Sequence, residues 1–379
     1  MSRSVGSLTF MGVGDVILGD PPDPKAIFTE VLPQLSQADV LFGQCECCYS
    51  LRGELLPQAR GRLSFHPRNV EALQLCGFDV MSLCSNHCLD MGFTALRDTI
   101  ANLAEAGIRQ VGVGENIAQA RRSVLVEKEG VTMAFLAYSP AQHPTFVATS
   151  SQLGNNPMQI YNYYRDPEPD FPGVAPEVIT LPDRRHLKWM REDVAKAKSE
   201  ADVVVVSFHW GLPFVRNALA DYESELAYAA IDAGADLIIG HHQHLLKGVE
   251  VYKGKVIFHG VNHLSVWIDY KRQSGDLAQA QSLEDRYGDA FFGDRMESSN
   301  PFHPDANNTI IVKAEIRDRK LDWVGFVPLK INDRSQPLPT SPGDGRFEEV
   351  VDYLAAVTAE VGFDTRFVVD GEAVRIVTS

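Results

Sequence analysis

Five short polar clusters, each placed where an apolar, strand-like run ends, constrain the fold of this chain more than any other feature. They are Gly14-Asp15, Gln44-Cys45-Glu46, Ser85-Asn86-His87, His209-Trp210 and Gly240-His241-His242-Gln243-His244. Each cluster contains a side chain that binds hard or borderline metal ions. In an α/β sheet, ligands gather outside the carboxyl ends of the strands. The clusters therefore predict strands that deliver Asp, Glu, Asn and His to one metal site.

The N-terminal part of the chain alternates strand-like and helix-like segments. The expected strands cover residues 8–13, 39–43, 79–83 and 108–113, and the expected helices cover 24–35, 69–76 and 94–106. Strands that alternate with helices predict a mainly parallel sheet that is buried on both faces.

The segments that follow residue 123 have a different character. Antiparallel hairpins are expected for 124–127 with 131–138, for 249–252 with 255–259 and for 309–316 with 320–329; helices are expected at 184–199 and 222–233, and strands at 202–208 and 236–239. Parallel strands followed by such hairpins predict two stacked mixed sheets with helices outside. The expected fold class is therefore α/β, as a four-layer α/β/β/α sandwich.

The chain is expected to divide into a large domain, residues 1–335, and a C-terminal remainder, residues 336–379. The large domain carries two long polar insertions, near 140–180 and 264–308, and insertions of this length usually serve a function. The remainder begins with a linker rich in Pro, Ser and Gly, followed by a helix at 347–361 and two short strands. It predicts a small C-terminal α+β appendage.

The charge balance is strongly acidic. Lys and Arg total 35 against 50 Asp and Glu, a net charge of −15, which argues against a nucleic acid or an anionic membrane as the partner. No apolar run approaches the ~20 residues of a membrane-spanning helix, and the N-terminus lacks the pattern of a signal peptide. We therefore expect a cytoplasmic protein without a membrane span; the oligomeric state stays open.

Six cysteines occur at positions 45, 47, 48, 76, 84 and 88. In a chain of this length that is expected to be cytoplasmic, a disulfide framework is not expected. Cys45, Cys47 and Cys48 lie beside Glu46, so a thiolate-rich zinc site is one interpretation. We favour free, buried thiols, because the spacing matches no repeated C-x2-C pair.

The histidine-rich segment 240–244 gives the strongest single indication of a metal. His242 and His244 are two residues apart, so an extended backbone would project both imidazoles to the same side. One strand end would then supply two nitrogen ligands. Three histidines among four residues at a strand end rarely serve packing alone.

The two acidic candidates are weaker when each is taken alone. Asp15 follows Gly14, which allows a close backbone approach, and the alternative is an Asp that merely forms a turn. Glu46 has two oxygens that can bind or bridge cations, and the alternative is a solvated loop glutamate.

The Asn86-His87 pair offers two kinds of chemistry. Asn86 can bind a metal through its amide oxygen, and His87 can donate a proton to a leaving oxygen while Asp90 holds its tautomer. The alternative is that Asn86 caps a helix and His87 is an ordinary surface histidine.

The remaining candidates come from two later segments. His209 is either a metal ligand or a packed histidine, and Trp210 is expected to form a wall rather than to react. Asn262 and His263 are expected to line the pocket. For His259 a structural role is as well supported as any other.

Together these clusters resemble the CapA family of bacterial poly-γ-glutamate capsule-synthesis proteins, which is similar to the calcineurin-like metallophosphoesterases. The resemblance covers residues 7 to 330 and rests on the motifs GVGDVILGD, ADVLFGQCE, FDVMSLCSNHCLDMG, VVVSFHWG and GADLIIGHHQHLLKGVEVYKGKVIFHG. It implies a metallophosphatase-like fold with divalent metal ions as cofactors.

The resemblance also implies roles for single residues. The implied metal ligands are Asp15, Glu46, Asn86, His209, His242 and His244. Glu46 stands where phosphoesterases carry a bridging aspartate, and His87 stands at the position of the proton donor. His241 matches an extra histidine that is common in CapA-like sequences, and we expect it to line the pocket.

The chain departs from these families at several positions. Phosphoesterases usually place a histidine two residues after the first aspartate, and here that residue is Ile17. CapA-like proteins usually read Asn-Leu-Glu at 44–46, often have an acidic residue at Pro213, and read Ser-Leu-Gly-Asn-Phe at 259–263. Ile17 leaves open whether one or two ions bind. The donor set suits Mn, Fe or Zn better than Ca.

Three functions are compatible with these features. The first is a metal-dependent hydrolase that attacks a phosphoester or related bond of a small molecule with activated water. The second is a polyglutamate-handling factor that binds an anionic polymer without phosphatase chemistry, with Arg165, Lys271 and Arg272 on the insertions meeting carboxylates. The third is a descendant whose site no longer works.

Overall fold

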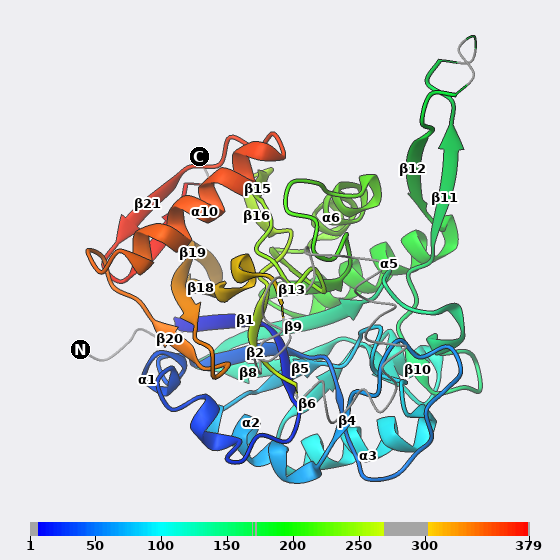
Figure 1. Ribbon diagram of the computed structural model, residues 1–379, viewed down its shortest axis with the longest axis horizontal. Coiled ribbons are helices and arrows are strands. Elements are labelled where there is room, and N and C mark those ends of the chain that lie inside the picture. Colours follow the sequence, from blue (N-terminus) through cyan, green and yellow to red (C-terminus); the bar gives the residue numbers. More distant parts are fainter. Residues whose placement is uncertain (1–6, 169, 171–172, 269–301, 378–379) are drawn as a thin grey trace.

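Two β-sheets stack face to face at the centre of the molecule, and helices cover the outer face of each (Figure 1). The computed structural model describes residues 7–168, 170, 173–268 and 302–377. Within these ranges the predicted four-layer α/β/β/α arrangement is confirmed.

The larger sheet contains ten strands among the described residues. Its order is β21-β22-β19-β18-β1-β2-β5-β6, with β17 beside β1 and β20 beside β19. The strands are β1 (Leu8–Leu18), β2 (Val40–Cys45), β5 (Val80–Ser82), β6 (Arg109–Val111), β17 (His263–Trp267), β18 (Asn308–Arg317), β19 (Lys320–Ile331), β20 (Pro337–Pro339), β21 (Phe367–Asp370) and β22 (Ala373–Ile376). The neighbours β1, β2, β5, β6 and β17 pair in parallel, whereas β18 to β22 pair antiparallel.

The smaller sheet has six strands in the same described part, in the order β15-β16-β14-β13-β9-β8. They are β8 (Val124–Lys128), β9 (Val131–Tyr138), β13 (Val203–His209), β14 (Leu237–His241), β15 (Val249–Tyr252) and β16 (Lys255–Phe258). β9, β13, β14 and β16 are parallel, and the two predicted hairpins β8–β9 and β15–β16 close the sheet on either side.

The helices form the two outer layers. α2 (Val70–Cys76) and α3 (Gly92–Glu105) pack on the larger sheet, α5 (Arg184–Glu200) and α6 (Asp221–Ala233) pack on the smaller one, and α10 (Arg346–Glu360) closes one end of the core between the sheets. The short elements are η1 (Lys25–Ile27), α1 (Leu32–Leu35), β3 (Cys48–Tyr49), β4 (Ser64–Phe65), η2 (Pro67–Asn69), β7 (Val113–Gly114), α4 (Ile117–Ala120), η3 (Pro144–Phe146), β10 (Gly154–Asn155), β11 (Ile160–Arg165), β12 (Glu177–Pro182) and η4 (Pro304–Asn307).

The continuous apolar runs of the central strands follow from burial on both faces. Along β13, Val203 and Val205 enter the core between the sheets, whereas Val204 packs under the helices α5 and α6. Across the same core, the rings of Phe42 and Phe135 stack with their centroids 5.5 Å apart. The stacking of the two sheets is therefore fixed by apolar side chains from every central strand.

Two predicted elements differ in the structure. The helix expected at 24–35 is only the turn η1 followed by the one-turn helix α1, because Pro33 lies in the first turn of α1 and begins a new helix there. The first strand does not stop at Gly14. β1 continues to Leu18 and changes register with its neighbours around Asp15, so Asp15 lies at a bulge inside the strand.

The two expected insertions also differ from their predictions. The segment 140–180 was expected without regular structure, but its residues 160–182 contain the hairpin β11–β12, which stands off the body (Figure 1). Cross-strand pairs such as Tyr163 with Ile179, and the Arg165–Glu177 ion pair, hold it together. In the segment 264–308, the first residues belong to β17 and pair with β1. Residues 269–301, with Lys271 and Arg272, lie outside the described residues.

The C-terminal segment joins the larger sheet. β22 pairs with β19, and α10 buries Phe347, Val350 and Leu354 in the core between the sheets. The division into two domains stays a prediction. Among the described residues, no helix combines the length and apolar character needed to cross a membrane.

Candidate metal centre

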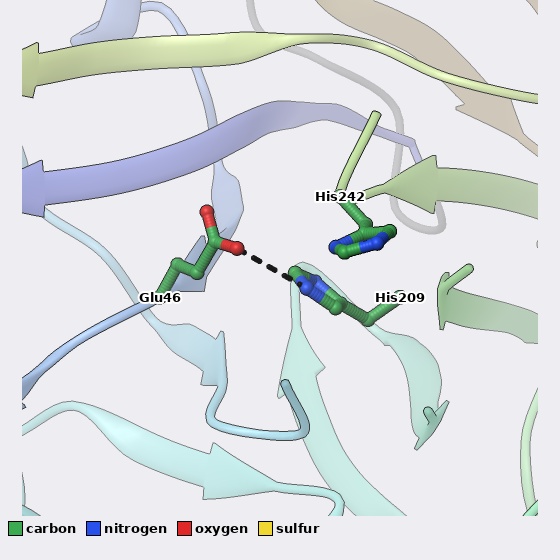
Figure 2. A group of neighbouring side chains, drawn as sticks. All are labelled: Glu46, His209 and His242. Atoms are coloured by element: carbon green, nitrogen blue, oxygen red, sulfur yellow. Dashed lines mark ion pairs between the residues drawn. The ribbon is translucent and has the colours of Figure 1, made fainter. Parts of the chain in front are cut away.

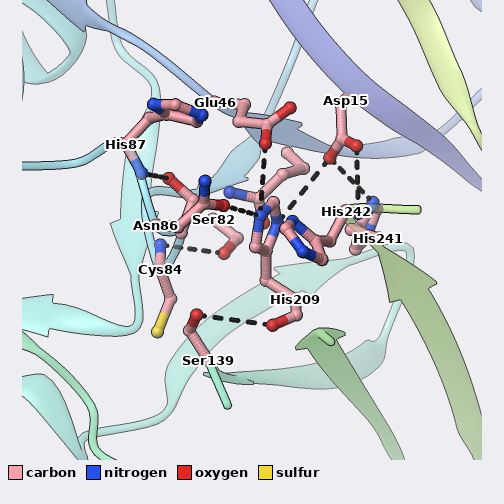
Figure 3. A network of polar contacts seen from close by, with 12 residues as sticks. Asp15, Glu46, Ser82, Cys84, Asn86, His87, Ser139, His209, His241 and His242 are labelled. Carbon is pink, nitrogen blue, oxygen red and sulfur yellow. Dashed lines mark hydrogen bonds and ion pairs between the residues drawn. The ribbon is translucent and has the colours of Figure 1, made fainter. Parts of the chain in front are cut away.

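Strand ends from both sheets converge on one buried cluster of polar side chains (Figure 3). The larger sheet contributes residues from β1, from the end of β2 and from the turn after β5, and the smaller sheet contributes residues from the ends of β13 and β14. The residues brought together are Asp15, Glu46, Asn86, His209, His241, His242 and His244. The six residues expected as metal ligands therefore lie in one place.

Two groups of three side chains each place one donor atom within 4.8 Å of the others. The first donor group is Glu46, His209 and His242 (Figure 2), and the second donor group is Asp15, Glu46 and His244. Oε1 of Glu46 lies 3.2 Å from Nε2 of His209, and Oε2 lies 3.8 Å from Nε2 of His244. Each oxygen of Glu46 thus faces a different donor group, so that this one carboxylate is shared by both.

Asn86 adds an oxygen donor to the first donor group. Its Oδ1 lies 2.7 Å from Nε2 of His209. The alternative that Asn86 caps a helix is wrong, because α3 begins at Gly92 and its N-cap residue is Met91.

Asp15 is held by the backbone around it. Its N–H donates to the carbonyl of Asn262 at 3.1 Å, and its Oδ2 accepts the backbone N–H of His242 at 3.1 Å. A Cβ at Gly14 would come within 2.2 Å of the Asn262 carbonyl oxygen. Gly14 is therefore required by the close approach that positions Asp15.

The histidine-rich segment reaches the site by a route that the sequence did not predict. β14 ends at His241, and the backbone is not extended beyond it, because φ is +94° at His242 and +54° at His244. The prediction that alternation along an extended strand aligns the two imidazoles is wrong. A left-handed backbone turns each ring into the cluster instead. Such conformations cost about 1–3 kcal/mol each and collect at functional sites.

His241 lies in the same cluster. Its Nδ1 is 3.6 Å from Oδ1 of Asp15, and its side chain is wholly buried. His209 also approaches Asp15, with Nδ1 3.9 Å from Oδ1.

The buried donor atoms of this cluster lack the hydrogen bonds that buried polar atoms usually have. The atoms without a hydrogen bond of good geometry include Asp15 Oδ1, both oxygens of Glu46, and Nδ1 of His209, His241, His242 and His244. So many unpaired donors in one place indicate that their partner is a cation. Carboxylate and amide oxygens with imidazole nitrogens fit divalent Mn, Fe or Zn.

The electrostatics of the cluster agree with this fit. Burial lowers the pKa of His241 to about 3 and that of His244 to about 4, so the rings are neutral at pH 7, which is the form that binds metals. Burial, and then the charge of Glu46, raise the pKa of Asp15 well above its ordinary value.

His87 and Asp90 form a second pair at the edge of the cluster. Nδ1 of His87 donates to Oδ2 of Asp90 at 2.7 Å, and the same oxygen accepts the N–H of Leu63 at 3.4 Å. Burial opposes the protonated ring, but Asp90 outweighs it and the pKa of His87 lies above its ordinary value. The His87 side chain keeps 15% of its surface exposed, whereas that of Asp90 is wholly buried. The surface alternative for His87 is therefore wrong.

A cavity of about 570 Å³ opens on this cluster. Its lining comes from the loop after β3, from residues 140–146 and from the loop after β13: Gln58, Arg60, Asn86, Pro140, Ala141, Gln142, His143, Pro144, Phe146, Gly211, Leu212, Pro213, Val215, Tyr222 and His242. Gln142 has a buried Nε2 without an acceptor. Sequence reasoning missed Gln58, Arg60, Gln142 and His143, because no local pattern marks them.

The residues that were expected to line the pocket lie elsewhere. Trp210 is wholly buried, stacks on Phe208 with the ring centroids 4.4 Å apart, and donates from Nε1 to the carbonyl of His259. Asn262 donates to the carbonyls of Ala306 and Asn308. Neither residue lines the cavity, nor do His241 and His263, which are wholly buried.

Two open questions from the sequence receive structural answers. His259 has a structural environment, because its Nε2 lies 3.0 Å from Oε2 of Glu250 and its ring stacks on Trp210 and Phe363. All six cysteines are free and buried, and the donor groups found among the described residues contain no cysteine. The thiolate site thus gains no support, and free thiols are observed.

Comparison with known proteins links the chain to one family. The model of the family described as "Bacterial capsule synthesis protein PGA_cap" matches residues 9–262. The capsule biosynthesis protein CapA of Bacillus anthracis is 30% identical over 271 residues, 69% of this chain and 60% of that protein. The PGA biosynthesis protein CapA of Bacillus subtilis is 28% identical over 260 residues, 66% of this chain and 61% of that protein. The chain thus spans about 60% of the length of these relatives.

Solved structures give more distant matches. A phosphatase from Mycoplasma pneumoniae is 15% identical, with a TM-score of 0.47, and the match covers 86% of this chain and 95% of that one. The calcineurin-like phosphoesterase YfkN from Bacillus subtilis is 14% identical, with a TM-score of 0.42, and the match covers 94% of this chain and 99% of that one.

Proposed function

The chain belongs to the PGA_cap family of bacterial capsule synthesis proteins, and from that premise we propose that it is a metal-dependent hydrolase of a phosphoester or related bond. The observation that carries the proposal is the pair of buried donor groups that share Glu46, in which Oδ1 of Asp15 and both oxygens of Glu46 lack a hydrogen bond of good geometry to the described residues. The proposed ligands are Asp15, Glu46, Asn86, His209, His242 and His244.

Divalent ions in this site would supply Lewis-acid activation of water and of a substrate oxygen. The chain holds them from two sides. Glu46 offers one oxygen to each donor group, and the bond from the His242 backbone N–H fixes Asp15. These contacts keep the ligands in place before any ion arrives, which favours binding.

His87 is the proposed proton donor to the leaving group. Asp90 accepts a hydrogen bond from the protonated Nδ1 of the His87 ring. Nε2 is therefore the nitrogen that can exchange a proton with a substrate. Part of the ring is exposed, whereas Asp90 is buried. Asp90 is the proposed positioning residue, because it fixes both the tautomer and the orientation of the imidazole.

The cavity suggests how a substrate is held. Arg60 brings a guanidinium to its lining, and Gln142 brings a buried amide N–H without an acceptor. Both are donors to oxygen, so the proposed substrate carries an anionic group or carbonyl next to the bond that breaks. The apolar lining, with Leu212, Pro213 and Phe146, suits an aliphatic or ring-bearing part of the same molecule.

The test begins with protein purified without chelators. Its metal content is measured by inductively coupled plasma mass spectrometry, and turnover is screened on phosphomonoesters and phosphodiesters. We expect stoichiometric Mn, Fe or Zn, and a turnover that His87→Ala removes while the metal stays bound. Protein without stoichiometric metal, or turnover that His87→Ala leaves intact, would contradict the proposal.

A second candidate is favoured by the names of the relatives. They are called capsule biosynthesis and PGA biosynthesis proteins, and a protein of this kind would bind an anionic polymer of γ-linked glutamate without hydrolysing phosphoesters. Arg165 on β11 is less suited to this role than the sequence indicated, because it already pairs with Glu177. Arg60 in the cavity is the better placed cation.

Calorimetric titration with γ-linked glutamate oligomers distinguishes the two candidates. Tight binding that persists after metal removal, together with no turnover of any phosphoester, would favour the polymer-binding role. Turnover that depends on metal and on His87 would favour the hydrolase.

A further inference from the structure

The two donor groups are not equally complete. The first donor group has a fourth donor, because Oδ1 of Asn86 lies beside His209. The second donor group consists of Asp15, Glu46 and His244, and Ile17, which follows Asp15 by two residues, packs in the apolar core on the helix side of the larger sheet. Tetrahedral protein sites for zinc-like ions use four ligands, or three and a water. A further protein ligand is therefore to be sought beside the second donor group.

His263 lies next to that group on a neighbouring strand. It is the first residue of β17, and its register partner in the parallel β1–β17 pair is Asp15. Register partners in a sheet project to the same face, so the two side chains lie on the same side of the sheet. The ring centroid of His263 is 6.1 Å from that of His244. Two imidazoles on one ion, each nitrogen about 2.1 Å from it, have ring centres about 5–6 Å apart.

The His263 ring has no hydrogen-bond partner among the described residues. Its side chain is wholly buried, and neither Nδ1 nor Nε2 bonds to any of those residues. A buried polar group without a partner costs about 1–3 kcal/mol, so an imidazole with both nitrogens unpaired points to a ligand.

The surroundings of His263 hold it in this position. Oγ1 of Thr309 donates to the His263 carbonyl at 2.7 Å, and Asn262 donates to two carbonyls of the segment 306–308. The ring of Phe302 stacks on His244 with the centroids 4.6 Å apart and lies 5.6 Å from His263. One apolar ring thus covers both imidazoles from the same side.

His241 is the other histidine that could fill this role, and both of its ring nitrogens also lack a hydrogen bond, but its position associates it with the first donor group. Its register partner is His209, a member of the first donor group. Its ring lies 6.2 Å from that of Phe42 in the core between the sheets. The contact of its Nδ1 with Asp15 suits a residue that orients the carboxylate.

We propose that His263 is the missing ligand of the second donor group, so that β17 supplies the histidine that β1 lacks at Ile17. The inference rests on the proposed metal centre, and it assigns two ions per chain. The match to the family model ends at Asn262, so this assignment comes from the geometry of this chain alone.

The experiment counts ions and needs no substrate. Metal-free protein is titrated with Mn²⁺ by calorimetry, bound metal is counted by mass spectrometry after gel filtration, and Co²⁺ absorption reports the coordination. The variants are His263→Phe and, in case the bulkier ring disturbs folding, the smaller His263→Ala. The matched control is His259→Gln, which removes another buried histidine of the same segment that bonds to Glu250. Circular dichroism checks the fold of each variant.

We expect two ions in the wild type and in the control. In both His263 variants the second ion should bind at least about 100-fold more weakly, since even indirect contacts to a ligand are worth 10–100-fold in affinity, and the Co²⁺ spectrum should lose its second component.

Two unchanged ions in both His263 variants would overturn the assignment and leave the metal centre standing. The same holds for loss of the second ion in His241→Phe alone, which would assign the role to His241. A single ion in the wild type that His263→Phe does not affect also overturns it. A wild type that binds no ion would remove the metal centre itself, and with it this inference.

Discussion

The two sheets contribute different chemistry to the same site. The larger sheet supplies oxygen donors, Asp15, Glu46 and Asn86, whereas the smaller sheet supplies nitrogen donors, His209, His242 and His244. Either set alone is incomplete, because each donor group contains members from both sheets. The cluster therefore forms only when the two sheets stack, and the apolar core between the sheets fixes how they stack.

The charges of the two sides differ in the same way. On the larger sheet, here called the oxygen side, two carboxylates are wholly buried within one cluster. On the smaller sheet, here called the nitrogen side, burial keeps the imidazoles neutral. A cation between the sheets relieves the repulsion of the carboxylates and satisfies the imidazoles at once. His263 would be an exception to this division, a nitrogen donor carried by the oxygen side.

The largest effect is expected from substitution of Glu46, the residue that both donor groups share. Glu46→Gln keeps the shape of the side chain but loses the charge, and we expect both ions to bind about 100-fold more weakly, whereas Asp15→Asn should weaken only one. Metal counting after gel filtration measures this. Glu71→Gln, an exposed glutamate paired with Lys25, is the control. If Glu46→Gln retains both ions, Glu46 does not bridge the two sides.

The next effect separates proton transfer from metal binding. His87→Asn should lower turnover by about 10²–10⁴-fold, the usual contribution of a general acid, while the bound metal stays unchanged. Asp90→Asn should act in the same direction and more weakly, because it disturbs only the orientation of the ring. Steady-state kinetics with metal analysis of the same samples checks both. Loss of metal in His87→Asn would show that this residue belongs to the ligand set.

A smaller effect is expected from substitution of Arg60, an arginine in the cavity lining. Arg60→Gln should raise KM for an anionic substrate about 10-fold with little change in kcat, because a charge-assisted hydrogen bond contributes about 1.5–3 kcal/mol. Arg62→Gln is the matched control, since Arg62 is exposed and does not line the cavity. Equal KM values for the two variants would exclude Arg60 from substrate binding.

The smallest effect is expected from substitution of Glu223 on α6, a helix that packs on the smaller sheet. Burial raises the pKa of Glu223 on α6 to about 7 from its ordinary 4.5. The folded state therefore holds this proton more tightly than the unfolded chain, so the stabilisation is complete below pH 4.5 and is lost as the pH rises through about 7. Glu223→Gln, which stays neutral, should gain a few degrees in Tm over the wild type between pH 5 and 7.

Scanning calorimetry at several pH values measures that gain. Glu225→Gln on the exposed side of α6 should follow the wild type at every pH. A difference between Glu223→Gln and wild type that does not change from pH 5 to 7 would mean that Glu223 does not titrate in this range.

The sequence was most informative where chemistry and local pattern coincide. Apolar runs that end in Asp, Glu, Asn or His predicted the central strands and the residues that meet at their ends. It was less informative about geometry. His242 and His244 were expected to align along an extended strand, but positive φ values bring them into the cluster. Backbone turns of this kind leave no clear mark in the sequence, since positive φ is uncommon for every residue type other than glycine.

The residues that line the cavity could not be predicted from local sequence patterns. Trp210 was expected to form a wall of the pocket, but it packs against α6 and donates a hydrogen bond to the His259 carbonyl. Arg60 and Gln142 line the cavity instead, and four strands of the two main sheets, β5, β6, β8 and β9, lie between them along the chain.

The amino-acid sequence by itself set the alternation of apolar strands with helices, their order along the chain, and the donor types at the strand ends. It could do so because periodicity and polarity are local properties. Which donor atoms lie close together, which side chains face the cavity, and the approach of His263 to His244 were decided only by the stacking of the two sheets. Contacts between distant segments depend on the packing of the whole core, and no short stretch of residues encodes them.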